Sequence, residues 1–175
     1  TRQIGARPVW LAASTHAGED EIVLEAHRRI RKTFPDALLV IAPRHPERGD
    51  AIAALAGGAP QRSRGASAAG ADVFIADTIG ELGVFYALAP VSLVAGSLLP
   101  TLKGHNPVEP AKLGSAVLTG PFVESFADTF AELEAAKGAV TVRDADAIAD
   151  IVLHLWTNET ERAALATAAL GATSA

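Results

Sequence analysis

Polar and basic side chains follow the first two buried apolar runs of the sequence, at the points where strands would end. Ser14 and Thr15 come directly after one run, and Arg44 and His45 come after the next. An arginine forks onto a phosphate, and hydroxyls beside the free amides of a helix start bind anions. These residues therefore favour a site for an anionic ligand. A helix N-cap and a solvated charged loop are the alternatives that need no ligand.

The turn over residues 77–83 also follows a buried run, and it contains Gly80 and Glu81. In a nucleotide-binding sheet such a turn would contact the base through its backbone. A capping box, in which Asp77 or Thr78 pairs with Glu81 at the start of a helix, explains the same residues without a ligand. Both interpretations stay open at the level of the sequence.

Open backbone precedes a helix in the second half of the chain. Gly96-Ser97 and Gly104-His105 supply it, and such a segment suits a phosphate held at a helix N-terminus. Glu109 would accept hydrogen bonds from both ribose hydroxyls of a nucleotide. A capping motif accounts for part of the segment by itself, with Asn106 as N-cap, Pro107 at N1 and Glu109 at N3.

Other chemistries are excluded or disfavoured by what the sequence lacks. It has no Cys, which excludes a thiolate nucleophile and Cys-ligated metals, and no GxGxxG, GxxxxGK[ST] or GxSxG motif. A net charge of −5 argues against a nucleic-acid binder that works by bulk charge. His16, His45 and His105 are candidate metal ligands, but no pair has helical ligand spacing, so we expect no metal. His27 and His154 are expected to be surface or packing residues.

The elements that must position these residues alternate along the chain. Short apolar runs are predicted to be strands: Val9–Ala13, Ala37–Ala42, Val73–Ala76, Val91–Ala95, Ala116–Thr119 and Ala139–Val142. Amphipathic segments are predicted to be helices: Glu19–Thr33, Arg48–Ala56, Glu81–Leu88, Val108–Leu113, Ser125–Ala136, Ala145–Trp156 and Glu159–Leu170. A weaker strand is expected at Ala59–Ser63.

The predicted strands lack the polar alternation of one-sided strands, so both of their faces are expected to be buried. With helices between them, this pattern predicts a doubly wound, parallel α/β sheet, which binds its ligand at the carboxyl ends of the strands. The length of 175 residues predicts one domain over residues 1–175. Because Gly and Pro interrupt the uncharged stretch Leu82–Leu102, we expect a buried helix and strand there instead of a membrane span. The chain starts at Thr1 and has no Met, so we expect it to be part of a longer protein.

Five blocks of the sequence together resemble the signature segments of bacterial 3-deoxy-D-manno-octulosonic acid (Kdo) transferases. In family order they are Ala13–Glu19, Pro43–Arg48, Asp77–Gly83, Gly96-Ser97 and Gly104–Ala111. The resemblance implies the Rossmann-like C-terminal half of a GT-B glycosyltransferase. Such an enzyme moves Kdo from CMP-Kdo onto a lipid A precursor in lipopolysaccharide biosynthesis, with inversion and without a cofactor or a metal. The family usually has glycine where Ala95 and Lys103 stand here.

The resemblance also implies a role for each candidate residue. Arg44 and His45 would meet the phosphate and the Kdo carboxylate, and Glu109 would meet the ribose. Gly80 and Glu81 would lie beside the cytosine. Ser97, His105 and Asn106 would surround the phosphate and the sugar, and Ser14, Thr15 and Gly104 complete the expected donor-binding set.

The family's catalytic base and lipid-binding surface belong to an N-terminal acceptor domain, which we expect to lie outside this chain. This polypeptide would then hold no catalytic residue, stay soluble, and bind CMP or CMP-Kdo without turnover. Contact with the cytoplasmic face of the inner membrane would come only through the other part. Two alternatives stay open: a non-catalytic nucleotide or sugar-phosphate binding module, and half of another GT-B-like enzyme such as a UDP-sugar epimerase.

Overall fold

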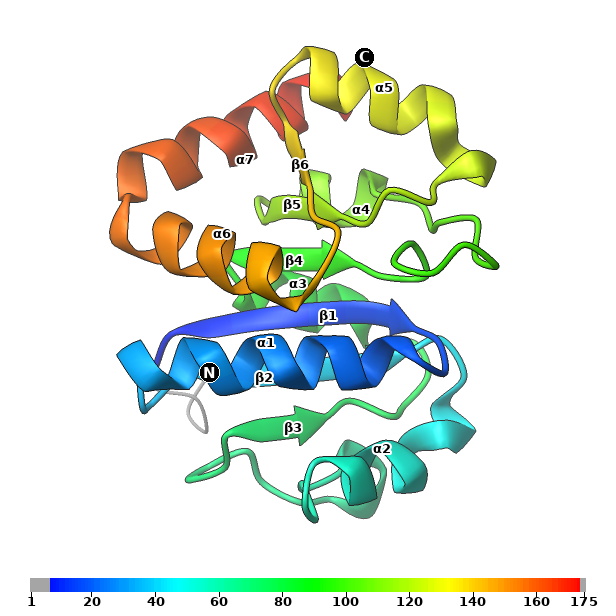
Figure 1. Cartoon of the computed structure of the whole chain (residues 1–175), viewed down its shortest axis with the longest axis vertical. Coiled ribbons are helices and arrows are strands. Elements are labelled where there is room, and N and C mark those ends of the chain that lie inside the picture. The colour runs from blue at the N-terminus through cyan, green and yellow to red at the C-terminus, as the bar shows by residue number, and fades with distance from the viewer. Residues whose placement is uncertain (1–6, 174–175) are drawn as a thin grey trace.

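All strands of the computed structural model run parallel in one six-stranded sheet (Figure 1). The structure describes residues 7–173. The strands are β1 (Val9–Thr15), β2 (Leu38–Pro43), β3 (Val73–Ile75), β4 (Val91–Val94), β5 (Ala116–Thr119) and β6 (Ala139–Thr141). They lie in the order β3-β2-β1-β4-β5-β6, so the direction of winding reverses between β1 and β4. Open parallel sheets bind ligands outside the carboxyl ends of the strands at such a reversal.

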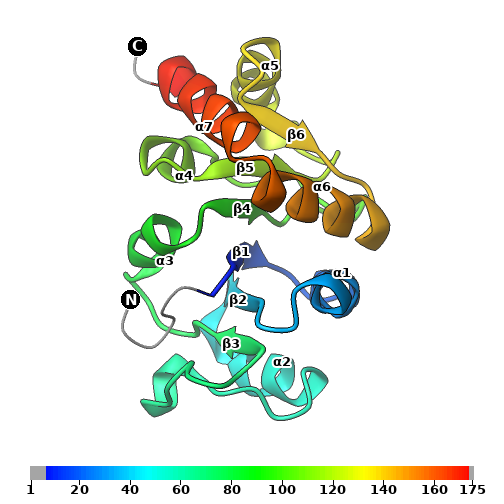
Figure 2. The same ribbon diagram turned by 90° about the vertical axis from the view of Figure 1, so that its left-hand side faces the viewer.

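Helices cover both faces of this sheet (Figure 2). One face carries α1 (Glu19–Thr33), α2 (Gly49–Leu55) and α6 (Ala145–Thr157), and the other carries α3 (Leu82–Leu88) and α4 (Val108–Lys112). Helix α5 (Ala127–Ala135) packs beside β6, and α7 (Glu159–Thr173) contacts both α6 and α4. Short 3₁₀ turns complete the chain: η1 (Pro46–Arg48), η2 (Arg62–Arg64) and η3 (Glu124–Phe126).

Successive residues of β1 point into different layers of the core. Trp10 and Ala12 pack in the layer of α1 and α6, whereas Val9, Leu11 and Ala13 pack in the layer of α3. All five side chains are buried. Because each central strand is covered on both sides, its sequence is almost entirely apolar, and the one polar residue of β4, Ser92, is buried and hydrogen-bonded to Ser115 (2.6 Å). The predicted Rossmann-like, doubly wound sheet is confirmed.

One predicted element is wrong. The segment Ala59–Ser63 forms only a single parallel bridge, between Gln61 and Ile75, and the chain then turns into η2. The carboxylate of Asp77 explains the turn, because it accepts hydrogen bonds from the Ser63 N–H (2.8 Å) and from the Ser63 hydroxyl (2.7 Å). These bonds hold Ser63 in η2, so the chain leaves the extended conformation directly after Gln61. The other predicted strands and helices occur within a few residues of their expected bounds.

The uncharged stretch over residues 82–102 forms α3 and β4, as expected. Proline 90 separates the two elements, and each has buried residues. Within residues 7–173 we find no helix of the length and apolar character that a membrane crossing requires.

His27 is a buried packing residue of α1, as expected. Trp10 donates its indole N–H to His27 Nδ1 (3.0 Å), and His27 Nε2–H donates to the carbonyl of Asp72 (2.8 Å). Both ring nitrogens are therefore used by the neutral form. Burial lowers the pKa of His27 from 6.5 to about 4. His154 is exposed and pairs with Glu161 on the surface.

The buried imidazole makes folding stability depend on pH. Below pH 6.5 the unfolded chain takes up a proton at His27 that the folded chain accepts only near pH 4, so acidification favours unfolding. Between pH 7.5 and pH 5 this group is expected to cost about 2 kcal/mol of unfolding free energy. Urea titrations at both pH values should show that loss in the wild type and a smaller one in His27→Gln. His154→Gln is the control, and equal pH dependence in wild type and His27→Gln would refute the assignment.

Candidate functional site

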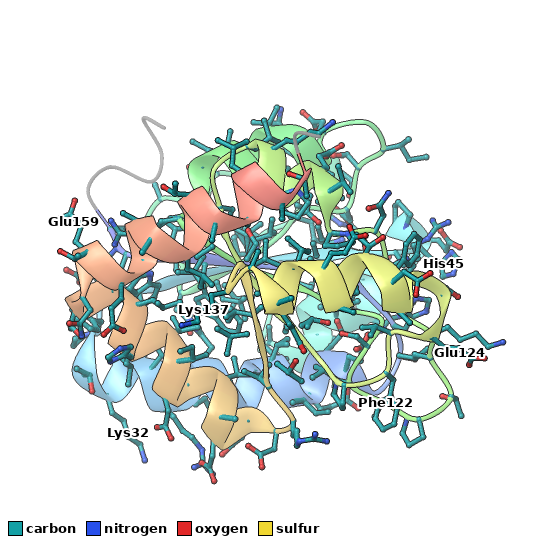
Figure 3. All side chains as sticks on the ribbon, turned by 90° about the horizontal axis from the view of Figure 1, so that it is seen from above. Lys32, His45, Phe122, Glu124, Lys137 and Glu159 are labelled. Atoms are coloured by element: carbon teal, nitrogen blue, oxygen red, sulfur yellow. The ribbon has the colours of Figure 1, made fainter. Side chains whose placement is uncertain are left out.

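The end of β1 and the segments that follow β2, β3 and β4 enclose a cleft of about 550 Å³. This volume is in the usual range for small-molecule sites. The predicted residues that line it are Ser14, Arg44, His45, Gly80, His105, Asn106 and Glu109. In Figure 3, His45 lies on the same side of the molecule as Phe122 and Glu124, opposite Lys32 and Glu159. The cleft therefore opens at the carboxyl edge of the sheet, where the topology predicts a ligand.

An irregularity in the pairing of β1 with β2 lies where Ser14 reaches the cleft. The register between β1 and β2 shifts between Ala13 and Thr15, and Ser14 there adopts a left-handed conformation with φ of 63°. Beyond the shift, Arg44 N–H donates to the Thr15 carbonyl (3.0 Å), which fixes the backbone of the β2 loop. Irregularities of this kind re-aim side chains at the ends of strands.

Arg44 is the free cation of the cleft. Its side chain is exposed and makes no hydrogen bond or ion pair with the residues that the structure describes. Other arginines nearby are already neutralised: Arg48 pairs with Asp20, Arg62 with Glu81 and Arg64 with Asp50. An unpaired guanidinium at a cleft offers two parallel N–H groups to a phosphate or a carboxylate.

Three imidazoles converge beside Arg44. His16 and His105 stack with their rings 8° from parallel, and their Nε2 atoms are 2.9 Å apart. His45 meets His16 edge-on, with 5.8 Å between ring centroids. Burial lowers the pKa of both His16 and His105. At neutral pH both rings are thus uncharged, and their contact requires that one Nε2 donates and the other accepts.

The three converging histidines are the candidate metal ligands of the sequence. Among the residues the structure describes, no group of three or more His, Asp or Glu side chains has an arrangement that holds a metal ion. The geometry instead matches a hydrogen-bonded pair with a third ring packed against it. Such rings carry N–H groups that can donate to an anion, as does the guanidinium of Arg44.

A free carboxylate lies in the same cleft as Arg44. Glu109, in the first turn of α4, is exposed and forms no ion pair within residues 7–173. Gly83 of α3 lies beside it, since a Cβ at that position would be 3.6 Å from Glu109 Oε1, an ordinary van der Waals contact. Burial and then the charge of Glu109 raise the pKa of the neighbouring Tyr86. One cleft thus offers both a free cation and a free carboxylate.

Tyr86, Phe85 and Ile79 also line the cleft and were not predicted. Tyr86 is almost fully buried, whereas the Ile79 side chain is 87% exposed. The sequence does contain a signal for the two aromatic residues, because they follow directly after the turn expected to contact a base. Apolar and aromatic walls with a few polar groups are typical of ligand sites.

The loop after β4 uses its backbone differently from the sequence-based expectation. The carboxylate of Glu19, which is fully buried, accepts the N–H groups of Gly96 (2.8 Å), Ser97 (3.1 Å) and Leu98 (3.0 Å). A fourth N–H comes from His16 (2.9 Å). The sequence suggested the amides of Gly96-Ser97 for a phosphate, but the carboxylate of Glu19 occupies them. The sequence predicted Glu19 only as the first residue of a helix.

Four predicted residues do not line the cleft. Thr15 and Ser97 are fully buried, and the Ser97 hydroxyl donates to Val94 O (2.8 Å) and accepts from Gly120 N–H (2.9 Å). Glu81 pairs with Arg62 (3.0 Å). The fourth is Gly104, described next. Their contacts with a ligand stay predictions.

Gly104 and Asn106 shape the chain that leads to α4. Gly104 has φ of +90° and donates its N–H to Gly96 O (2.8 Å), which joins the two ends of the loop. The predicted cap is shifted by one residue: α4 begins at Val108, and Asn106 Oδ1 accepts the Val108 N–H (3.0 Å).

The other predicted cap, at the start of α3, forms only in part: the Thr78 hydroxyl donates to Glu81 Oε1 (2.5 Å), but no side chain accepts a backbone N–H at the helix start. The side chain of Asp77 instead accepts hydrogen bonds from Gln61 (2.9 Å) and Ser63. The carboxylate therefore ties η2 to the end of β3, and α3 starts without a side-chain cap.

No family model matches the chain. The 3-deoxy-D-manno-octulosonic acid transferase of Haemophilus influenzae is 35% identical over 168 residues, which are 93% of this chain and 39% of that protein. The chain thus spans about two fifths of the length of this curated relative.

Solved structures give the same result for the fold. The C-terminal CMP-Kdo binding domain of WaaA from Acinetobacter baumannii superimposes with a TM-score of 0.93 and 30% identity, over 98% of this chain and 92% of that one. Two more distant structures share the fold alone. They are the C-terminal domain of a group 1 glycosyl transferase from Francisella tularensis (TM-score 0.64, 14% identity, 97% and 85% covered) and a UDP-N-acetylglucosamine 2-epimerase, described as putative, from Listeria monocytogenes (0.66, 14%, 94% and 40%).

These matches agree with the signature blocks and with the cleft at the reversal of the sheet. The expected architecture, the C-terminal half of a GT-B glycosyltransferase, is confirmed. The chain belongs to the 3-deoxy-D-manno-octulosonic acid transferase family and corresponds to its C-terminal domain.

Proposed function

We propose that this chain is the donor-binding domain of a Kdo transferase and that it binds CMP-Kdo in the cleft at the carboxyl edge of the sheet. The observation that carries the proposal is that unpaired Arg44 and unpaired Glu109 line the same cleft. Arg44 and His45 suit the phosphate and the sugar carboxylate, and Glu109 suits the two ribose hydroxyls. The turn with Gly80 suits the base. The names of the relatives support this choice of ligand.

The chemistry of the transfer fits this placement. A hydroxyl of the acceptor attacks the anomeric carbon of Kdo, and the bond from that carbon to the phosphate oxygen breaks. The electron pair stays on the phosphate of the departing CMP, whose growing negative charge Arg44 and His45 would stabilise. The proton of the acceptor hydroxyl goes to a general base. The proposed step needs no cofactor.

We place the base and the binding site for the lipid A precursor on the remainder of the full-length enzyme. This chain spans only about two fifths of the length of its Haemophilus influenzae relative. The full-length protein would work at the cytoplasmic face of the bacterial inner membrane. The chain alone would then bind CMP or CMP-Kdo and release it unchanged.

Titration calorimetry with CMP and UMP tests the proposal. We expect binding of CMP in preference to UMP. Glu109→Ala is expected to weaken CMP binding roughly 10- to 100-fold, because a charged hydrogen-bond acceptor is lost. Glu124→Ala is the control: this exposed glutamate lies on the same side of the molecule but does not line the cleft.

Each other outcome has a definite meaning. A folded chain that binds neither nucleotide would contradict the proposal. A preference for UMP would favour the alternative of a UDP-sugar enzyme. Equal binding of both nucleotides, unaffected by Glu109→Ala, would favour a general nucleotide-binding module.

A further inference from the structure

Glu19 makes an unusual set of contacts for an acidic residue in the first turn of a helix. Its side chain is fully buried and accepts four backbone N–H groups from two loops that are nearly 80 residues apart in the sequence. Three consecutive amides that point at one anion form a concave anion site of the kind that holds phosphates in other proteins. Here the anion belongs to the chain itself.

The two loops held by Glu19 carry the paired imidazoles of the cleft. His16 donates its own backbone N–H to Glu19, and Gly96 accepts the N–H of Gly104, the residue before His105. The imidazoles lie directly against Gly96, where a Cβ would come within 2.2 Å of His105 Cδ2 and 3.3 Å of His16 Cδ2. Each ring is therefore attached to backbone that the carboxylate of Glu19 orients.

We propose that Glu19 is a positioning residue that acts as an internal substitute for a ligand phosphate. Its carboxylate fills the amide site at the strand-order reversal, holds the loops after β1 and β4 together, and so fixes the His16–His105 pair. Because that site is filled with negative charge, the ligand phosphate is directed to Arg44 and His45. The first part stands on the geometry alone, and the second rests on the proposed nucleotide binding.

The isosteric variant Glu19→Gln tests this inference. Glutamine keeps the size of the side chain, but its NH₂ group would face backbone N–H donors that need an acceptor. Asp144→Asn is the matched control, since the carboxylate of Asp144 also accepts a backbone N–H at a helix start, that of Ala147 (2.8 Å), but does not line the cleft or contact the amides of the β4 loop. Thermal unfolding checks that each variant folds, and Glu19→Asp, which keeps the charge, should restore part of any loss.

The first readout needs no ligand. In nitrogen-15 spectra of the imidazoles at pH 7.5, the wild type should show one protonated and one unprotonated Nε2 for the His16–His105 pair. Glu19→Gln should change both sets of signals, and Asp144→Asn should leave them in place. Unchanged imidazole signals in a folded Glu19→Gln variant would overturn the inference. So would wild-type spectra in which the two rings behave as independent, exposed imidazoles, a result that requires no variant to fold.

The second readout is binding of CMP. Glu19→Gln is expected to lower the affinity at least tenfold, and Asp144→Asn by less than twofold. Amide spectra of the wild type should show that CMP leaves Gly96, Ser97 and Leu98 nearly unaffected, and shifts of these three amides comparable to those near Arg44 would overturn the second part. If the wild type fails to bind CMP while Glu19→Gln still alters the imidazoles, the proposed function is wrong and the positioning role stands.

Discussion

Replacing Arg44 with alanine is expected to weaken the binding of CMP roughly 30- to 150-fold, or about 2–3 kcal/mol. The reason is that Arg44 is the free cation among the cleft-lining residues, so no neighbouring arginine can take over its phosphate contact. The CMP affinity of Arg44→Lys should lie between those of the wild type and Arg44→Ala, because lysine keeps the charge but loses the paired N–H groups of the guanidinium. Calorimetric titration of the three proteins with CMP measures the effect.

Arg143→Ala is the matched control for this series. Arg143 is also exposed and makes no ion pair within residues 7–173, but it lines a separate depression beside α5. Its loss should change CMP binding by less than twofold. If both alanine variants lose affinity equally, the contribution of Arg44 is only its share of the net charge, and the placement of the phosphate is wrong.

Gly96→Ala is expected to lower the unfolding free energy by about 3–5 kcal/mol, because it combines backbone strain with overpacking. Gly96 has φ of +73°, and its missing Cβ would lie 2.2 Å from His105 Cδ2 and 2.5 Å from His105 Nε2. The ring of His105 cannot retreat without losing its contact with His16. Urea unfolding at pH 7.5, where both rings are neutral, measures the loss.

Gly114→Ala separates the two causes. Gly114 has a similar φ of +81°, but a Cβ there would meet nothing within 4 Å. Gly114→Ala should therefore lower the unfolding free energy by only about 1–2 kcal/mol, the strain of an alanine in the left-handed conformation. Equal losses in the two variants would show that the close approach of the imidazoles to Gly96 does not constrain the site.

The fold was predictable because its signals are local. The central strands are mainly apolar runs, as the run through Leu11 in β1 illustrates, because both of their faces are buried. Parallel order then places the residues after every strand at one edge. Arg44 and His45 could be grouped with Glu109 in this way although Glu109 lies far from them in the sequence.

The roles of Glu19 and Ser97 could not be predicted because they depend on contacts distant in sequence. Glu19 fits the helix dipole at the start of α1, and nothing local shows that the β4 loop folds over it. Ser97 sits in a glycine-containing segment typical of a phosphate site, but its hydroxyl joins the ends of β4 and β5. In both cases tertiary packing decides which polar groups remain free for a ligand.

A crystal structure of this chain with CMP tests the central claim most directly. The account predicts the phosphate within hydrogen-bond distance of Arg44 and His45, the ribose hydroxyls on Glu109, and the carboxylate of Glu19 still bound to the amides of the β4 loop. A phosphate seated on the amides of Gly96–Leu98, or a ribose remote from Glu109, would contradict it.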